Sequence, residues 1–260
     1  MVGPRTVERG KRQSESGPPR PPRSGRLLRS RMLIILLLAV VLGGGGSFWL
    51  LYGSPWLRVE HVSVSGTRVL TEAQVRQAAD VPLGSPLVSL DTDAIEARLR
   101  RKLPRIASAD VACSWPGGIG LKVTERSPVL IVPNGGKFVE VDGEGVRFAT
   151  VSQAPKAVPT LELTVSSSAV ARRFGTGRLI REAARVAQAV PAAVARDTRV
   201  LKVRSYDSIS LELSDGRSVL WGSDEKGRAK AAALVALMKA TPRARHFDVS
   251  VPTAPASSGS

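Results

Sequence analysis

One uncharged stretch constrains this chain more than any other feature. Residues 32–52, MLIILLLAVVLGGGGSFWLLY, contain no Asp, Glu, Lys or Arg. At 1.5 Å rise per residue, a helix of this length covers roughly the 30 Å that a bilayer core requires. We therefore predict a transmembrane helix from Met32 to Tyr52, with ordinary globular sequence after it.

The charges on the two sides of this stretch predict its orientation. Residues 1–31 hold nine Lys or Arg and two Glu, whereas only Arg58, Glu60 and His61 follow within ten residues. Basic residues accumulate on the cytoplasmic side of a membrane span. We expect a cytoplasmic N-terminus and extracytoplasmic C-terminal domains, the type II arrangement. A cleaved signal peptide is the alternative, although no A-x-A-like site ends the run.

Both ends of the chain lack the apolar residues that a packed core needs. Residues 1–31 include GPPRPPRSGR, and residues 253–260 are small and polar. Such composition is typical of disorder. We expect a disordered basic cytoplasmic tail over 1–31 and a disordered C-terminal tail over 253–260.

Composition argues against several classes of function. The formal net charge is +16, yet no aromatic-studded basic motif of a nucleic-acid-binding module is present. Cys113 is the only cysteine, which excludes an intramolecular disulfide; its alternation with Val111 and Trp115 predicts a buried small residue on a strand. The two histidines, His61 and His246, are too few for a metal site. We predict no catalytic residues, cofactor, metal or small-molecule substrate.

Residues 57–126 follow the order strand, helix, helix, strand, strand. Thr71 and Gln74 have the spacing of a capping box, which starts a helix that ends near Ala79. Asp91 caps the second helix, and Pro104 stops it. The expected strands cover residues 59–65, 109–115 and 119–125.

Basic side chains crowd the end of the second helix. They are Arg98, Arg100, Arg101, Lys102 and Arg105. A solvated face that complements the negative helix terminus explains them in one interpretation. A recruitment or docking patch for an acidic partner, formed by Arg98, Arg101, Lys102 and Arg105, is the other.

Residues 127–252 predict an antiparallel sheet with helices on one side. Hairpin signals stand at 142–145 and at Asp215-Gly216. A two-residue turn at the second hairpin would place its apolar residues on one face: Ile209, Leu211, Leu213 and Leu220.

Two helices and a closing strand complete this half. One helix covers 179–190, and another starts after Ser223. The second has an expected core stripe of Ala231, Leu234, Val235 and Met238. A strand with the sequence HFDVSV follows before the C-terminal tail.

The two halves resemble the FtsQ/DivIB family of bacterial division proteins. The first half is similar to the POTRA domain of that family. The second half is similar to the β-domain that follows the POTRA domain in the same family. The motifs that carry the resemblance are Arg100, Leu103-Pro104, Val111, Trp115-Pro116, Val123-x-Glu125-Arg126-x-Pro128, Val141-Asp142-x-x-Gly145 with Phe148, and Leu213-Ser214-Asp215-Gly216.

The resemblance implies an α+β fold: one N-terminal transmembrane helix, a POTRA domain over 57–126 (β-α-α-β-β), and an FtsQ-type β-domain over 127–252. It also implies a non-enzymatic divisome scaffold at the septum of the cell membrane. Such a scaffold links division-ring assembly to septal peptidoglycan synthesis and binds FtsB/DivIC-like and FtsL-like proteins, with septal synthesis proteins as further partners.

In that family the C-terminal part of the β-domain offers an edge for a partner strand. An unpaired edge supplies rows of N–H and C=O groups for such addition. The corresponding residues here are Phe247, Asp248, Val249, Ser250 and Val251. An ordinary terminal strand is the alternative interpretation of this segment.

Two other functions are compatible with a membrane anchor. A POTRA-containing envelope assembly factor would need tandem POTRA units or a β-barrel. A bitopic envelope sensor or enzyme would need a signalling domain or a catalytic cluster, and neither is recognisable.

Overall fold

The computed structural model describes residues 24–164 and 175–259, and it divides into two compact units, 1–57 and 58–260. The first unit contains α1 (Ser24–Gly53) and a 3-10 turn (Pro55–Leu57). Within α1, residues 31–49 have a mean hydropathy of 2.2 and are long and apolar enough to cross a membrane.

The helix corrects one boundary of the sequence analysis. It begins at Ser24, so residues 24–31 of the expected disordered tail are helical, while residues 1–23 lie outside the described residues. Arg and Leu are good helix formers, and RLLRSR contains no Gly or Pro to stop the helix before the apolar run.

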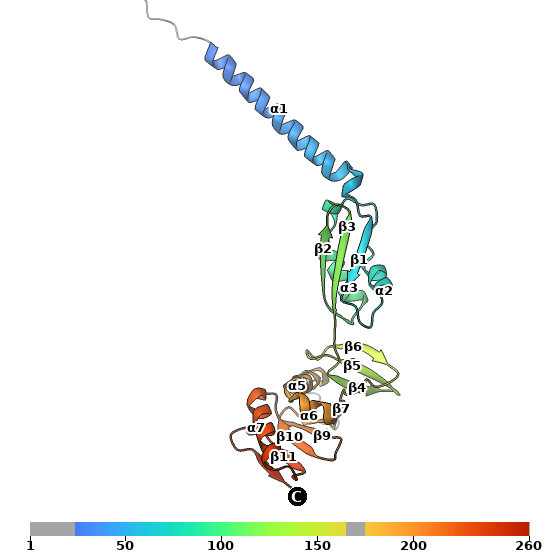
Figure 1. The fold of residues 1–260 in the computed structure, drawn as a ribbon, viewed down its shortest axis with the longest axis vertical. Coiled ribbons are helices and arrows are strands. Elements are labelled where there is room, and N and C mark those ends of the chain that lie inside the picture. Colours follow the sequence, from blue (N-terminus) through green and yellow to red (C-terminus); the bar gives the residue numbers. More distant parts are fainter. Residues whose placement is uncertain (1–23, 165–174, 260) are drawn as a thin grey trace, which may run out of the picture. The chain divides into compact units, whose positions relative to one another are not determined.

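The second unit begins with a three-stranded sheet in the order β1-β3-β2 (Figure 1). β1 pairs parallel with β3, and β2 pairs antiparallel with it, so β3 is the central strand. Two helices complete the β-α-α-β-β unit predicted from the sequence. The elements are β1 (His61–Ser65), α2 (Glu72–Ala79), α3 (Thr92–Lys102), β2 (Ile106–Ser114) and β3 (Gly118–Glu125).

Local sequence explains where both helices start. The Thr71 hydroxyl accepts a hydrogen bond from the Gln74 N–H at 3.2 Å, and the Gln74 side chain accepts one from the Thr71 N–H at 2.9 Å, which confirms the capping box. Asp91 accepts from the Ala94 N–H at 2.9 Å. Gly66 follows β1 with φ +87°, where a Cβ would collide with the carbonyl of Val123.

Cys113 and Trp115 differ from the prediction. Cys113 is half-buried, and Trp115 is 56% exposed. β2 ends at Ser114, so Trp115 lies in the turn and no longer follows the strand alternation on which the prediction rested.

The remaining strands form one nine-stranded sheet, in the order β12-β11-β10-β9-β8-β7-β4-β5-β6. The sheet is mixed: β4–β7, β7–β8 and β10–β11 are parallel pairs. Its strands are β4 (Leu130–Asn134), β5 (Lys137–Val141), β6 (Arg147–Val151), β7 (Thr160–Leu163), β8 (Thr198–Ser205), β9 (Ser208–Leu213), β10 (Ser218–Gly222), β11 (His246–Asp248) and β12 (Ala256–Ser258).

Helical connections account for two of these parallel pairs, because parallel neighbours require a crossover. The segment between β7 and β8 contains α5 (Thr176–Ala189) and α6 (Ala192–Asp197), and α7 (Gly227–Ala240) joins β10 to β11. Apolar residues of the helices and the sheet share one core, which includes Ile180, Leu211, Trp221 and Leu234.

The hairpin between β9 and β10 corrects a predicted register. Val219 pairs with Leu211, and Leu220 pairs with Ser210. Val219 is therefore buried, whereas Leu220 is 40% exposed rather than on the core face. The connection is one residue longer than the assumed two-residue turn, with Gly216 at φ +81°, and a one-residue shift turns every following side chain to the opposite face.

The stripe of α7 is also different. Leu234 is fully buried, but Val235 is 50% exposed and Lys230 is buried. The Lys230 ammonium donates to the Ser223 carbonyl at 2.9 Å, and this partner makes its burial possible. The expected core stripe contained apolar residues alone, so it did not include Lys230.

Candidate partner-binding site

The C-terminal end of the large sheet contains the predicted partner-binding segment, but its edge is covered. β11 pairs with β10 on one side and antiparallel with β12 on the other. Phe247 lies opposite Val219 and Ser257. Phe247 and Asp248 therefore do not lie at a free edge, whereas Val249, Ser250 and Val251 lie beyond the residues that pair with β12.

The covering strand comes from the tail that the sequence predicted to be disordered. After Val251 the chain turns, with the Ala254 N–H donating to the Val251 carbonyl at 3.0 Å, and it returns as β12. Small residues lack the apolar side chains of a core but still form backbone ladder bonds. The amino-acid composition of residues 253–260 therefore does not reveal that this segment pairs with β11 as a strand.

The five predicted residues have different environments. Phe247 and Val249 are buried in the core shared with Trp221, and the Val249 N–H donates to the Leu220 carbonyl at 3.0 Å. Asp248 accepts hydrogen bonds from the Ser250 N–H at 2.9 Å and hydroxyl at 2.6 Å. Only Val251 has an exposed side chain among the five. Most of these side chains therefore hold the segment in the fold, and few of them are exposed to a binding partner.

β12 is the first strand in the order of the sheet, so its outer side is the edge. The Arg245 N–H donates to the Gly259 carbonyl at 2.9 Å, which marks His246 and Ser258 as a non-hydrogen-bonded pair. Because the pattern alternates, Ser257 bonds to β11, whereas the N–H and C=O of Ala256 and the N–H of Ser258 point outward. The Ser258 carbonyl accepts a further hydrogen bond from the Arg245 N–H at 3.1 Å. The edge is short and carries small side chains.

The predicted basic patch is divided. The Arg98 guanidinium donates to the carbonyls of Ala79 at 2.6 Å and Asp80 at 3.0 Å, at the end of α2. Arg105 binds elsewhere, which leaves Arg101 and Lys102 exposed together with Arg100. The structure does not bring the four predicted docking residues into one solvent-facing group.

Arg105 reaches from the residue before β2 to the large sheet. Its Nη2 lies 2.6 Å from Oε2 of Glu140 on β5, and its guanidinium carbon lies 5.1 Å from the ring centre of Phe148 on β6. Nearby, Arg126 forms ion pairs with Asp142 and with Glu144. Arg126 and Asp142 belong to two separate sequence motifs, and neither motif predicts that the two side chains pair.

Glu125, at the end of β3, holds the segment before α2. Its carboxylate accepts hydrogen bonds from the N–H groups of Arg68 at 2.8 Å, Val69 at 3.1 Å and Leu70 at 3.0 Å. Burial acts to raise the pKa of Glu125, but these backbone donors outweigh it and lower the pKa below its usual value.

A pair of carboxylates, Glu182 and Asp224, joins α5 to the loop before α7. Arg185 lies 3.4 Å from Glu182 and 3.2 Å from Asp224, and the Tyr206 hydroxyl donates to Asp224 at 3.3 Å. Burial raises the pKa of Glu182, and hydrogen bonding to Asp224 raises it further. For Asp224, burial is outweighed by hydrogen bonds from Glu182, Arg185 and Tyr206, which lower its pKa. The cluster therefore holds one proton more readily than two separate carboxylates would.

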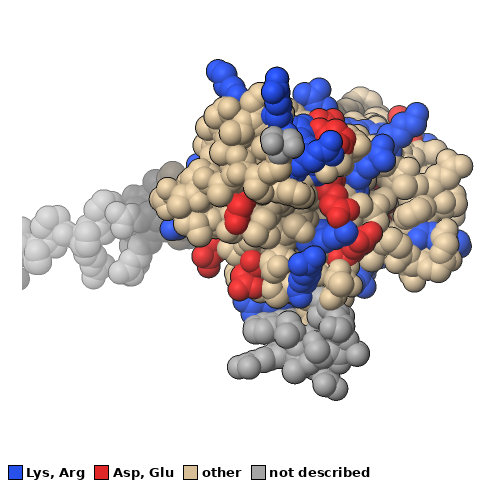
Figure 2. All heavy atoms as spheres, turned by 90° about the horizontal axis from the view of Figure 1, so that it is seen from below, with Lys and Arg blue, Asp and Glu red and all other residues tan. Residues whose placement is uncertain are grey.

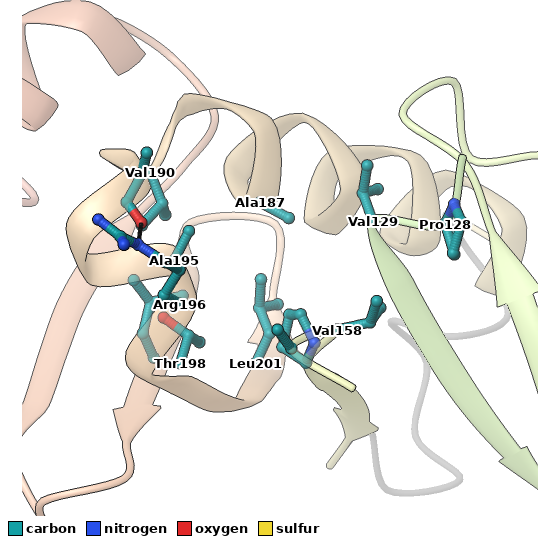
Figure 3. Close-up of a pocket in the computed structure, with 13 residues that line it drawn as sticks. Pro128, Val129, Val158, Ala187, Val190, Ala195, Arg196, Thr198 and Leu201 are labelled. Atoms are coloured by element: carbon teal, nitrogen blue, oxygen red, sulfur yellow. Dashed lines mark hydrogen bonds between the residues drawn. The ribbon is translucent and has the colours of Figure 1, made fainter. Parts of the chain in front are cut away.

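An apolar cavity of about 300 Å³ lies beside α5 and α6 (Figure 3). Pro128, Val129 and Leu201 are among the residues that line it. Arg196 is the charged residue of the lining, and its Nε donates to the Ala192 carbonyl at 3.3 Å. The lining contains no pair of groups suited to acid–base or nucleophilic chemistry.

Charge on the surface is mixed. On the face shown in Figure 2, basic and acidic side chains are interspersed instead of forming one region of a single sign. Within residues 24–164 and 175–259, no group of three or more His, Cys, Asp or Glu is arranged to hold a metal ion.

Similarity to known proteins identifies the family. A family model described as "POTRA domain, FtsQ-type" matches residues 57–126, and one described as "Cell division protein FtsQ/DivIB, C-terminal" matches residues 130–250. A cell division protein FtsQ of Streptomyces collinus is 69% identical over 264 residues, covering 100% of both chains. The chain belongs to the FtsQ/DivIB family of cell division proteins.

A second Streptomyces protein agrees with this assignment. The cell division protein FtsQ of Streptomyces coelicolor is 69% identical over 265 residues, again covering 100% of both chains. A solved structure of the major extracytoplasmic domain of DivIB from Geobacillus stearothermophilus aligns with 46% of this chain and 97% of that one, at 21% identity and a TM-score of 0.33.

Proposed function

We propose that this FtsQ/DivIB protein is a bitopic, non-enzymatic scaffold of the bacterial divisome. Its N-terminus lies in the cytoplasm, α1 crosses the cell membrane, and residues 57–126 and 127–252 act outside as a POTRA domain and a β-domain. The basic residues before the span support this orientation. The scaffold links division-ring assembly to septal peptidoglycan synthesis.

The observation that carries the partner-binding part of the proposal is the outer edge of β12. Ala256 directs its N–H and C=O, and Ser258 its N–H, away from β11, and β12 ends the sheet. An FtsB/DivIC-like partner adds a strand to this edge, and an FtsL-like protein joins the same complex. Main-chain hydrogen bonds provide affinity, and pockets for alternate side chains provide selectivity. Phe247 in β11 and Val249 just after it lie in the core, so they hold the strand that pairs with β12 in place.

Proline substitution tests this placement at single-residue resolution. Ala256→Pro removes an outward N–H without removing a bond to β11, so we expect full-length protein in lipid nanodiscs to lose at least tenfold in affinity for its FtsB/DivIC-like partner. Ser257→Ala is the matched control, because it keeps the whole backbone ladder. Unchanged affinity of a folded Ala256→Pro variant would overturn the placement.

A localisation experiment tests the cellular role separately. A fluorescent fusion of the full-length protein is expected at division septa. A second fusion, with residues 32–52 replaced by an unrelated span, is expected to localise equally, because the anchor only tethers the domains. Uniform peripheral fluorescence of the first fusion in dividing cells would contradict a divisome role.

The basic residues of α3 support a narrower recruitment surface than the sequence suggested. Arg101 and Lys102 remain available to an acidic partner, whereas Arg98 and Arg105 have internal acceptors. Exchanging Arg101 and Lys102 for Glu should therefore reduce septal recruitment without unfolding the protein. Equal septal fluorescence of this variant and the parent would remove the surface from the proposal.

A further inference from the structure

Exposed apolar side chains lie at one end of the domain that contains the three-stranded sheet. This is the end at which the chain arrives from α1. In residues 58–164 and 175–259, eight large apolar side chains are exposed, and three of them are Leu83, Val88 and Trp115. Leu83 is 67% exposed and Trp115 56% exposed. Trp115 is also the exposed tryptophan of these residues, since Trp221 is buried.

Hydrogen bonds place these three residues at one end of the small sheet. The Trp115 turn joins β2 to β3, and Gly117 accepts from the Glu60 N–H at 2.8 Å, just before β1. Gly84, next to Leu83, donates to the Val59 carbonyl at 2.8 Å. Cys113 Sγ lies 3.9 Å from the Leu87 carbonyl, which brings the Val88 turn beside the end of β2.

Chain length keeps this end close to the anchor. The apolar part of α1 ends at Trp49, α1 itself ends at Gly53, and the second unit starts at Arg58. At 1.5 Å per helical residue and about 3.5 Å per extended residue, Arg58 cannot lie more than about 25 Å from the hydrocarbon edge. Leu83 and Trp115 lie close in the chain to residues that bond to Val59 and Glu60, so the length of the connection allows this end of the sheet to reach a bilayer surface.

We propose that Leu83, Val88 and Trp115 form a lipid-binding surface that rests in the interface of the outer leaflet. Tryptophan is enriched at that depth, because its ring is apolar and its N–H remains close to water. The charges beside the surface are mixed, with Arg58, Glu60 and Arg76 nearby, so apolar insertion rather than attraction to acidic lipid supplies the affinity. The proposal rests on α1 crossing the membrane and does not depend on any division partner.

The domain provides its own control. Val69 is 66% exposed, almost the same as Leu83, but it lies at the opposite end of β3, where its N–H donates to Glu125. β3 runs from Gly118 to Glu125, and at about 3.3 Å per residue its ends are about 23 Å apart. A fluorescent label at position 69 therefore reports the effect of exposure alone. A label at position 83 reports contact with lipid as well.

The experiment uses the full-length chain with Cys113→Ser, in vesicles of phosphatidylcholine that carry a nitroxide near the headgroups. One variant adds Leu83→Cys and the other Val69→Cys, each labelled with an environment-sensitive fluorophore. We expect nitroxide lipid to quench the label at 83 at least threefold more than the label at 69. Trp115→Glu, added to the first variant, should lower its quenching at least twofold.

Two results would overturn the proposal. Equal quenching at 83 and 69 would show that the surface has no preference for lipid, and insensitivity to Trp115→Glu would show that the tryptophan does not hold the domain there. Flotation of the protein with the vesicles verifies that α1 is inserted, and circular dichroism verifies that each variant is folded. Failure of the surface is therefore distinguishable from failure of the anchor.

Discussion

Arg105 Nη2 donates a hydrogen bond to Oε2 of Glu140 across 2.6 Å, and both side chains are largely withdrawn from water. Arg105→Ala would leave the Glu140 carboxylate buried without its counter-charge. We expect this variant to lose about 3–5 kcal/mol of unfolding free energy, the range for breaking a buried pair from one side. Urea unfolding of the full-length protein in detergent micelles measures the loss.

The double variant Arg105→Ala/Glu140→Ala is the control for that prediction. Because it removes the buried charge as well as its partner, it should recover most of the lost unfolding free energy. If Arg105→Ala alone were as stable as the parent, the ion pair would have no role in holding the two sheets' strands together at this point.

The Glu125 carboxylate predicts a pH dependence. Its pKa is lowered in the folded protein, so its stabilising contribution is present above the unfolded value near 4.5 and is lost as the pH falls through the folded pKa. Glu125→Gln should cost about 1–3 kcal/mol at pH 7, and the difference from the parent should shrink on acidification. Unfolding curves at several pH values test this. A difference that grew below pH 4 would contradict the assignment.

Glu182 predicts the opposite pH dependence. Its raised pKa means that the folded protein holds the proton more tightly, so the parent loses stability as the pH rises from about 4.5 through the folded pKa. Glu182→Gln cannot ionise and should melt about 2–4 °C higher than the parent at pH 7, with no difference at pH 4. Thermal unfolding by circular dichroism provides the measurement. The idea fails if the variant is less stable than the parent at pH 7.

The β9–β10 register predicts unequal effects for neighbouring residues. Val219 is fully buried and Leu220 faces outward, so Val219→Ala should cost about 2 kcal/mol while Leu220→Ala costs less than about 1 kcal/mol. The register with a two-residue turn would give the reverse order. Parallel urea titrations of the two variants decide between them.

Local signals in the sequence predicted local structure well. The caps at Thr71 and Asp91 define the starts of α2 and α3, and α3 ends at Lys102, just before Pro104. The resemblance in the family motifs led to the α+β fold and to the family. These features depend on residues a few positions apart, where the sequence determines geometry directly.

Features that depend on distant residues were not predictable in the same way. The ion pair of Arg105 with Glu140 joins positions 35 residues apart, and the sequence around each residue does not indicate that it pairs with the other. The pairing of β12 with β11 uses backbone groups, which every residue has, so the edge was placed at Phe247 instead of Ala256. One extra residue in the Gly216 turn was enough to misplace Leu220.

The parallel pairing of β1 with β3 has a mechanical consequence. The chain enters β1 after α1 and leaves β3 toward the large sheet, and five residue pairs from His61↔Gly118 to Ser65↔Lys122 join the two strands. Tension between α1 and the nine-stranded sheet would pull β1 by its start and β3 by its end. The hydrogen bonds between them are then loaded together in shear instead of opening one after another, so the three-stranded sheet can transmit force between α1 and the large sheet without its strands separating one bond at a time.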